Sequence, residues 1–259
     1  MSKTALITGS SGGIGYELAK IHAGNGGDLV LVARSKNKLD EMKTELVKKH
    51  GISVHTIGKD LSIPGSAKEI YDELNMLKIS VDYLINNAGF GDFGLFESCD
   101  WEKQEQMINV NVLALTHLTR LFLPSMISRG SGRIMNLAST ASFQPGPTMS
   151  VYFASKAFVL SFSEAINNEI EDRGITVTAL CPGSTESGFH QATLGEGKLV
   201  KKRKIPSSEA VAKYGYKAMM KGKAVAIYGL KNAVMANLVR IWPRSVVVKM
   251  ARKIQSGKY

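Results

Sequence analysis

The sequence predicts an α/β fold with a doubly wound parallel sheet and helices on both of its faces. Short apolar segments alternate with helical ones along the 259 residues, which is typical of consecutive βαβ units. Several segments, such as residues 81–86, are almost continuously apolar, as expected for strands that are covered on both sides. We expect about seven strands, at residues 3–8, 28–33, 52–57, 81–86, 132–138, 175–181 and 224–228.

A glycine-rich turn follows the first predicted strand. Gly9, Gly13 and Gly15 lie between this strand and a helix that runs toward Ile21. Glycines at these positions allow a tight turn and a close approach of the backbone to a phosphate, and the N–H groups at the start of the helix bind the anion. The turn therefore predicts a dinucleotide site. No Gly-Lys-Ser/Thr sequence follows it, which excludes a Walker-type loop.

The second predicted strand, at residues 28–33, ends at Arg34. In nucleotide-binding folds of this kind, the residue at this strand end meets the adenosine ribose, where an acid would bond the 2′-hydroxyl of NAD. An arginine instead suits a 2′-phosphate. We therefore expect NADP as the cofactor, with NADPH preferred over NADH. The alternative is that Arg34 only begins a solvated helix.

Tyr152 and Lys156 lie four residues apart at the start of an apolar-periodic segment that ends at Arg173. On a helix these two side chains share a face. A phenol has a pKa of about 10, and a neighbouring ammonium group favours the phenolate and lowers this pKa. A tyrosine tuned in this way exchanges a proton with a carbonyl or an alcohol. The alternative is a surface tyrosine beside a solvated lysine.

Ser139 follows the predicted strand at residues 132–138. Ligands of open α/β sheets bind outside the carboxyl ends of the strands. A hydroxyl group at this place can donate a hydrogen bond to a carbonyl oxygen beside Tyr152. Alternatively, Ser139 only terminates the strand in a turn.

Together, these motifs resemble a single-domain member of the short-chain dehydrogenase/reductase family, which implies a Rossmann-type fold. The resemblance covers about residues 3 to 230, and the segment after Ile205 looks similar to bacterial short-chain reductases of unassigned substrate. The motifs that carry it, in the family's order, are Thr8–Gly15, Asp60-Leu61, Asn86–Gly89, Asn109–Val112, Ser139, Tyr152 with Lys156, and Pro182-Gly183.

The resemblance implies a catalytic set of four residues. Lys156 would bond the nicotinamide ribose as well as lower the pKa of Tyr152. Asn111 would hold a local helix kink and a water molecule that links Lys156 to solvent. The implied catalytic residues are Asn111, Ser139, Tyr152 and Lys156.

The resemblance also implies the contacts to the cofactor. Asp60 and Leu61 would lie at the adenine, and residues 87–89 would line the adenosine side. Ser187 stands where the family usually has threonine, and it keeps the hydroxyl group. The implied cofactor-binding residues are Gly9, Ser11, Gly13, Ile14, Gly15, Arg34, Asp60, Leu61, Asn87, Ala88, Gly89, Tyr152, Lys156, Pro182, Gly183, Thr185 and Ser187.

Length and composition predict one catalytic domain over residues 1–259, because a chain of this size buries one large core and no linker or repeat divides it. Cys99 and Cys181 are the only cysteines, and the first residues do not resemble a signal peptide. We therefore expect reduced thiols and a cytoplasmic protein. The five histidines lack the spacing of metal ligands, so we expect no metal.

The sequence places a substrate loop at residues 185–205, with further pocket walls at residues 143–149 and at Phe90. A largely apolar pocket without a fixed cation favours a lipophilic carbonyl substrate over a small polyanionic one. The same residues would equally suit an apolar core. The residues of interest in the loop are Phe189, His190, Leu194 and Leu199.

We expect an NADP(H)-dependent oxidoreductase that interconverts a carbonyl and an alcohol on a lipophilic substrate. One alternative is a catalytically silent sensor or scaffold that binds a dinucleotide, and another is an epimerase or isomerase on the same fold. The intact set of Asn111, Ser139, Tyr152 and Lys156 favours the oxidoreductase, because a silent relative is expected to lose at least one member.

The formal net charge of +11 arises in the last quarter of the chain. Residues 196–259 carry 16 Lys and Arg side chains against 2 Asp and Glu. Over residues 230–259 apolar residues interleave with the basic ones, and Pro243 divides two helical segments that are too short to span a bilayer. This basic amphipathic extension packs either on the domain or a second subunit, or on an anionic membrane surface. Nucleic acid is disfavoured as a partner because aromatic residues are sparse.

Two predicted helices, at residues 101–122 and 150–172, carry apolar residues on more than one face. A helix that is apolar nearly all round is usually buried. One face would pack on the sheet and another on a second subunit, so we expect a homodimer or homotetramer. The apolar residues are Leu113, Leu115, Leu118 and Leu121 in the first helix, and Phe158, Leu160, Phe162 and Ile166 in the second.

Overall fold

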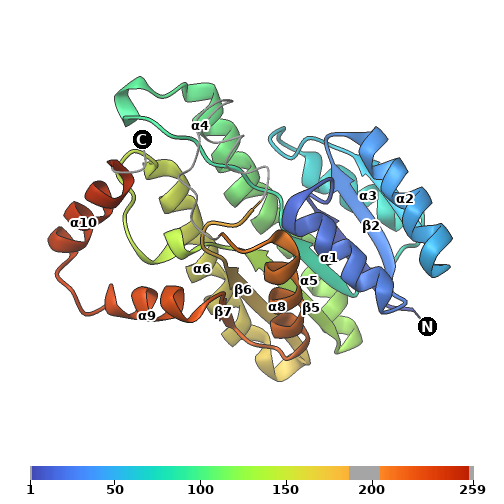
Figure 1. The fold of residues 1–259 in the computed structure, drawn as a ribbon. Coiled ribbons are helices and arrows are strands. Elements are labelled where there is room, and N and C mark those ends of the chain that lie inside the picture. Colours follow the sequence, from blue (N-terminus) through green and yellow to red (C-terminus); the bar gives the residue numbers. More distant parts are fainter. Residues whose placement is uncertain (1, 187–204, 257–259) are drawn as a thin grey trace.

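The computed structural model describes residues 2–186 and 205–256. Within these residues, seven strands form one parallel sheet in the order β3-β2-β1-β4-β5-β6-β7 (Figure 1). The predicted doubly wound, Rossmann-type sheet is confirmed, and each predicted strand end lies within two residues of the observed one. The strands are β1 (Thr4–Thr8), β2 (Asp28–Ala33), β3 (Val54–Gly58), β4 (Tyr83–Asn86), β5 (Gly132–Leu137), β6 (Ile175–Cys181) and β7 (Val225–Ile227).

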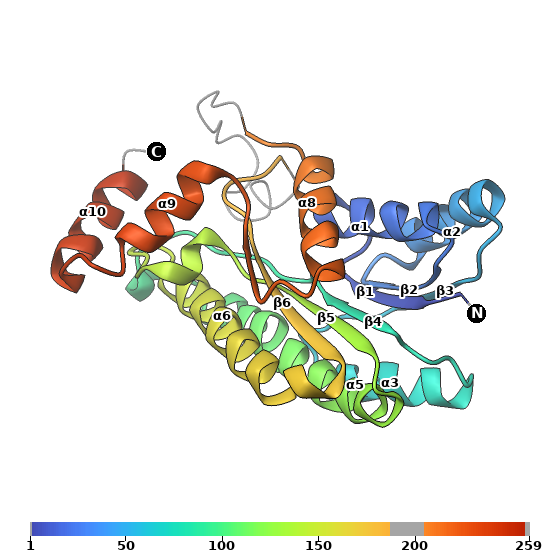
Figure 2. The ribbon, with the colours of Figure 1, turned by 90° about the horizontal axis from the view of Figure 1, so that it is seen from below.

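Helices cover both faces of the sheet (Figure 2). Leu18 and Leu39 belong to the apolar core on one face, whereas Ile70 and Phe122 belong to the core on the other. The strands are buried between these two cores, which explains why they are apolar almost throughout. One face carries α1 (Gly13–Gly24), α2 (Lys36–His50) and α8 (Ser208–Met220), and the other carries α3 (Ser66–Met76), α5 (Leu115–Arg129) and α6 (Ser150–Ile170).

The direction of strand progression reverses at β1. Strands β2 and β3 lie on one side of β1, and β4 to β7 lie on the other. The loops that leave the carboxyl ends of β1 and β4 therefore run apart. In open α/β sheets, ligands bind outside the carboxyl ends of the strands at such a reversal.

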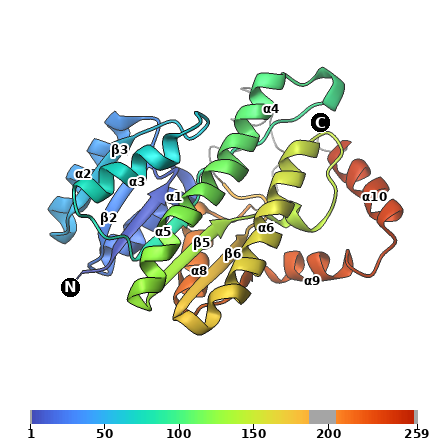
Figure 3. The ribbon, with the colours of Figure 1, turned by 180° about the vertical axis from the view of Figure 1, so that it is seen from behind.

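The predicted helix at residues 101–122 is longer and less regular than expected. It consists of α4 (Trp101–Ile108), a π-helical segment η2 (Asn109–Ala114) and α5, and it runs beside α6 (Figure 3). Among the described residues, this is the one helical segment that is long and apolar enough to cross a membrane by length and composition. Phe122 and Met126 are buried in the core, so packing against the sheet accounts for its apolar character.

The basic extension forms two helices, α9 (Leu230–Leu238) and α10 (Arg244–Ser256), and Pro243 divides them as predicted. Part of the apolar stripe packs on the domain, since Ala236, Val247 and Ala251 are buried. A larger part of it remains exposed. The short helical turns elsewhere are η1 (Phe96–Ser98), η3 (Thr140–Phe143) and η4 (Glu171–Arg173).

Candidate active site

The glycine-rich turn joins β1 to α1 at the reversal of strand order. Gly9 and Gly13 have positive φ angles of 64° and 55°, which residues with a side chain rarely adopt. Gly15 is needed for a different reason. A Cβ atom at Gly15 would lie 2.4 Å from Nδ2 of Asn87 and 2.5 Å from the carbonyl oxygen of Gly9.

Helix α1 begins without a capping side chain. Its N-cap residue is Gly12, and a Cβ atom added there would have no neighbour within 4 Å. Ser11 and Ile14 flank this point in the chain. The first N–H groups of a helix lack partners within the helix and carry the positive end of its dipole. An open, uncapped helix start therefore fits the pyrophosphate of a dinucleotide.

Asn87 and Ala88, which follow β4, brace the glycine-rich turn. Nδ2 of Asn87 donates to the carbonyl oxygens of Thr8 and Gly9, at 2.9 and 3.1 Å. The backbone N–H groups of Asn87 and Ala88 both donate to Oγ1 of Thr8 at 3.0 Å. The Asn87 side chain thus holds the turn in shape. Thr8 accepts three of these four bonds, and sequence analysis did not single it out.

We expect Gly15→Ala to lower the free energy of unfolding by about 1–3 kcal/mol, the usual cost of overpacking a tight site, and to weaken dinucleotide binding. The added methyl group would collide with the carbonyl of Gly9 and with Asn87. Gly12→Ala is the matched control because its position is open. Urea unfolding and fluorescence titration measure both effects. Equal behaviour of the two variants would contradict this account of the turn.

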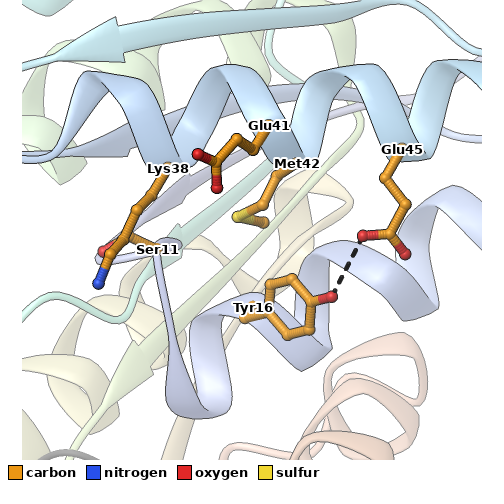
Figure 4. A pocket seen from close by; sticks show the side chains of 6 residues that line it. All are labelled: Ser11, Tyr16, Lys38, Glu41, Met42 and Glu45. Carbon is orange, nitrogen blue, oxygen red and sulfur yellow. Dashed lines mark hydrogen bonds between the residues drawn. The ribbon is translucent and has the colours of Figure 1, made fainter.

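Arg34 follows the carboxyl end of β2 and is exposed. A hollow of about 340 Å³ between α1 and α2 adjoins Ser11 in the glycine-rich turn. Figure 4 shows Lys38 extending toward Ser11, while the hydroxyl of Tyr16 donates to Glu45 at the other end of the hollow. Lys38 is therefore a second basic residue near the turn. Sequence analysis missed it because one lysine in a charged helix gives no distinguishing signal.

Asp60 and Leu61 lie in the loop that follows β3. Oδ1 of Asp60 accepts hydrogen bonds from the N–H group and the hydroxyl group of Ser62, at 2.9 and 2.8 Å. Leu61 is buried. The carboxylate of Asp60 thus stabilises its own loop, and contact of this loop with an adenine remains a prediction.

Ser139, Tyr152 and Lys156 converge at the carboxyl end of β5. Ser139 and Tyr152 form a hydrogen bond between their side chains. Nζ of Lys156 donates to the carbonyl oxygen of Leu137 at 2.7 Å and lies 5.9 Å from the centroid of the Tyr152 ring. All three side chains are buried. The structure brings these residues together, whereas their catalytic roles remain predictions.

Asn111 lies in the π-helical segment η2 and is fully buried. Its Oδ1 accepts from the N–H group of Phe90 at 3.1 Å, and its Nδ2 donates to the carbonyl of Phe90 and to Oγ of Ser155, at 3.0 and 3.1 Å. A Cβ atom at Gly89 would lie 2.8 Å from Oδ1 of Asn111 and 3.3 Å from Nζ of Lys156. Asn111, Gly89 and Lys156 are therefore immediate neighbours, and the helix is locally distorted at Asn111.

Burial dominates the electrostatics of this centre. It raises the pKa of Tyr152 to about 12, although the hydrogen bond with Ser139 acts in the opposite direction. Burial also lowers the pKa of Lys156 to about 8. Our expectation that Lys156 lowers the pKa of Tyr152 is therefore wrong for this geometry. Lys156 bonds the carbonyl of Leu137, and the loss of hydration penalises the phenolate.

The segment after β6 adjoins Ser139. The carbonyl oxygen of Pro182 accepts a hydrogen bond from Oγ of Ser139 at 3.5 Å. Thr185 is buried, and its hydroxyl group donates to the carbonyl of Gly183 at 3.0 Å. Ser187 lies outside the described residues, so its predicted cofactor contact stays a prediction.

An apolar cluster surrounds Tyr152. Both predicted pocket walls contribute to it, namely Phe90 and residues 143–149. Most of the predicted substrate loop at residues 185–205, including Phe189, His190, Leu194 and Leu199, lies outside the described residues. The cluster consists of Met107, Ala141, Tyr152 and Phe153, with Phe90, Met149 and Val151 packed against them.

Two serine hydroxyl groups that sequence analysis missed hold the first turns of α6. Oγ of Ser142 donates to the carbonyl of Lys156, and Oγ of Ser155 donates to the carbonyl of Tyr152, both at 2.7 Å. Serine is common in loops and helices, so its type alone does not reveal such a role. In residues 2–186 and 205–256, no three His, Cys, Asp or Glu side chains lie close enough together to hold a metal ion.

A family model described as short chain dehydrogenase matches residues 3–196 of the chain. The chain belongs to the short-chain dehydrogenase family. Members of this family are oxidoreductases that bind a nicotinamide dinucleotide and act on an alcohol or a carbonyl group, and this protein is one of them.

Several characterised members of the short-chain dehydrogenase family are similar over most of the chain. Very-long-chain 3-oxoacyl-CoA reductase of Rattus norvegicus is 33% identical, over 96% of this chain and 78% of the relative. Ketoacyl reductase HetN of a Nostoc species is 35% identical, over 70% of this chain and 63% of the relative. A solved short-chain dehydrogenase from Sphingobium yanoikuyae in complex with NADPH has a TM-score of 0.82 and 31% identity, and the match covers 93% of this chain and 97% of that one.

Proposed function

We propose that this protein is an NADPH-dependent reductase of lipophilic ketones, with long-chain 3-oxoacyl thioesters as the preferred class. The observation that carries the proposal is the convergence of Ser139, Tyr152 and Lys156 beside an apolar cluster at the carboxyl edge of the sheet. The names of the rat and Nostoc relatives, both ketoacyl reductases, support this substrate class. Arg34 and Lys38 beside the glycine-rich turn support NADP.

In the proposed mechanism, bound NADPH supplies a hydride to the carbonyl carbon. The hydroxyl group of Tyr152 gives its proton to the carbonyl oxygen, and the hydroxyl group of Ser139 donates a hydrogen bond to the same oxygen. Lys156, whose Nζ is held by the carbonyl oxygen of Leu137, orients the nicotinamide ribose. Asn111 is assigned a positioning role at Lys156, because both side chains border the space beside Gly89. These roles are assigned by the family resemblance together with this geometry.

The raised pKa of Tyr152 fixes the protonation state from which carbonyl reduction starts. With a pKa of about 12, Tyr152 holds its proton at neutral pH and is ready to donate it. Oxidation of an alcohol would need the phenolate, which is scarce under these conditions. The apolar surroundings that raise this pKa are also those that would accept a long acyl chain.

The test of the proposed function is NADPH oxidation across aldehydes, ketones, steroids and 3-oxoacyl thioesters of increasing chain length. We expect kcat/KM to rise by up to about fourfold per buried methylene group, which corresponds to about 0.8 kcal/mol. NADPH binding without oxidation of any substrate would favour a silent sensor. Conversion of a substrate without net NADPH consumption would favour an epimerase.

We expect NADPH affinity to fall as pH rises through about 8. Below this pH Lys156 carries the charge that attracts the cofactor, and above it the amine is neutral because its pKa is lowered to about 8. A fluorescence titration from slightly acidic to alkaline pH measures the change. Lys156→Met should bind NADPH more weakly and lose the step near pH 8. An unchanged step in Lys156→Met would show that another group titrates.

We also propose a homodimer or homotetramer that uses the outer face of α5 and α6. Leu113 in η2 and Phe158 in α6 are 57% and 41% exposed, whereas Leu118 in α5 and Leu160 in α6 are buried. The exposed aromatic ring of Phe158 stacks on Phe162. Light scattering should give an oligomer for the wild type and a monomer for Leu113→Asp/Phe158→Asp. A monomeric wild type at micromolar concentration would refute this assembly. We further propose that residues 1–259 form a single domain and that the protein is cytoplasmic.

A further inference from the structure

Helices α9 and α10 leave an apolar face uncovered by the described part of the chain. They extend from the end of the molecule that lies farthest from α2 and β3 (Figure 2). Helix α10 is anchored through Val247 and Ala251, which lie four residues apart and are buried. The neighbouring face of the same helix remains exposed, as does most of α9. The exposed apolar residues are Leu230, Val234, Met235, Leu238, Ile241, Trp242, Val246, Met250 and Ile254.

The loop between β4 and α4, together with the first residue of α4, exposes a second apolar group at the same end of the molecule (Figures 1 and 3). Leu95, Phe96 and Trp101 are 53%, 62% and 62% exposed. Hydrogen bonds join this loop to α10 through one residue. The N–H group of Gly94 donates to the carbonyl of Thr148 at 2.9 Å, and Oγ1 of Thr148 donates to Oε1 of Gln255 at 2.9 Å.

This arrangement places both apolar groups at the rim of the active site. Thr148 belongs to the segment at residues 143–149, whose Met149 packs in the apolar cluster around Tyr152. The surface formed by α9, α10 and the loop at residues 95–101 therefore borders the wall of the proposed substrate pocket. We refer to it as the rim surface.

The charge of the rim surface indicates which kind of partner binds to it. Its six basic side chains on α9, α10 and their connection are exposed and outnumber the two exposed acidic ones, Glu97 and Asp100 of the loop, and the sequence contains no Asp or Glu after Glu209. A second copy of the chain, related by twofold symmetry, would bring the same basic surface against itself, and like charges would repel. Anionic lipid headgroups complement these charges, while apolar side chains and Trp242 enter the interfacial layer. The basic residues are Lys231, Arg240, Arg244, Lys249, Arg252 and Lys253.

We propose that the rim surface docks on an anionic lipid membrane and turns the mouth of the active site toward the bilayer. A lipophilic substrate then enters the pocket from the membrane instead of from water. The second half of this proposal rests on the proposed reductase function, whereas membrane docking by itself does not.

The docking test uses sedimentation of the full chain with vesicles of phosphatidylcholine, with or without phosphatidylglycerol. We expect binding to the anionic vesicles at low salt and release at high salt, because salt screens surface charges. Arg240→Glu/Arg244→Glu/Lys249→Glu should reduce binding at least ~10-fold, since each basic side chain near the surface contributes measurably. Lys43→Glu/Lys48→Glu/Lys49→Glu is the matched control, because it makes the same charge change on exposed positions of α2.

A second pair of variants tests the apolar part of the rim surface. Phe96→Ser should weaken vesicle binding although Phe96 lies about 130 residues before α9 in the sequence. Met76→Ser is its control, because Met76 is 81% exposed and belongs to α3, which lies away from α9 and α10 (Figure 2). Thermal unfolding of each variant verifies that the fold is intact.

Three results would overturn the docking proposal. The first is a wild type that does not bind anionic vesicles at low salt. The second is an equal loss of binding in both triple variants. The third is a rim variant that becomes a smaller oligomer in light scattering, which would make this surface a subunit interface.

Activity separates this proposal from the proposed function. A triple rim variant should reduce a short, water-soluble ketone at the wild-type rate, but it should show a raised KM for a long-chain substrate presented in anionic vesicles. Vesicle binding without NADPH oxidation on any substrate would leave docking in place and refute the reductase. NADPH oxidation without vesicle binding would support the reductase and refute membrane docking.

Discussion

Replacing Tyr152 with phenylalanine should lower kcat for NADPH-dependent carbonyl reduction by at least ~10²-fold, the lower range for loss of a general acid. The variant removes one hydroxyl group and keeps the ring that packs against Phe153. The fold and the affinity for NADPH should therefore stay close to those of the wild type. Stopped-flow or steady-state NADPH oxidation on the best substrate measures the rate, and thermal unfolding measures stability.

Tyr71→Phe is the matched control for this substitution. It removes the same hydroxyl group from α3, where the ring of Tyr71 packs against Phe122 away from the catalytic residues. This variant should turn over at the wild-type rate. If Tyr152→Phe also kept the wild-type rate, the proton would come from another group, and the proposed role of Tyr152 would be wrong.

The sheet was predictable because its signals are local. A strand that is buried on both faces must be apolar along its whole length, and the segments between such strands must be long enough for a crossover helix. Both requirements are visible in single segments such as residues 28–33. The glycine-rich turn was equally predictable, since Gly9 and Gly13 adopt positive φ angles and Gly15 leaves no space for a side chain.

The proximity of Ser139, Tyr152 and Lys156 needed more than local pattern. Residues 139 and 152 approach only because η3 and the segment after it return the chain from β5 to the start of α6. The proximity of Ser139 to Tyr152 was predicted from the family resemblance. Residue spacing alone predicted only that Tyr152 and Lys156 lie close together. The supporting bonds of Thr8, Ser142 and Ser155 were not predictable, because short hydroxyl side chains find their partners only in the folded structure.

The electrostatics of the centre show where a pairwise argument fails. From spacing, the ammonium of Lys156 should lower the pKa of Tyr152. In the folded protein both groups are buried, so desolvation acts on each of them and moves both pKa values toward the neutral forms. The degree of burial is a property of the whole fold, and one helix turn does not reveal it.

The basic extension was predicted as two helices, but its packing was left open between the domain and a partner. The structure shows that one part of the extension is buried against the chain itself and that another part is exposed. Val247 and Ala251 pack on the domain, while Met250 and Ile254 on the adjoining face do not. A helix face that is only partly buried has the same apolar sequence pattern as a face that is fully buried. Only the folded structure shows which part of the face is covered.

Replacing Arg34 with aspartate should reverse the cofactor preference from NADPH to NADH. Arg34 is exposed at the carboxyl end of β2, where the adenosine ribose binds in folds of this kind. A charge-assisted hydrogen bond contributes about 1.5–3 kcal/mol, so its loss alone should weaken NADPH binding by about 10- to 100-fold. Repulsion between the new carboxylate and the 2′-phosphate should weaken it further.

The same carboxylate should accept a hydrogen bond from the 2′-hydroxyl of NADH, so the affinity for NADH should be kept or increased. Fluorescence titration of both cofactors measures the preference. Lys43→Asp introduces the same charge change farther along α2 and should leave the preference of the wild type intact. A wild type that binds NADH as tightly as NADPH would remove the premise. A variant that still prefers NADPH would assign the 2′-phosphate to other basic groups, such as Lys38, which lines one hollow with Ser11 (Figure 4).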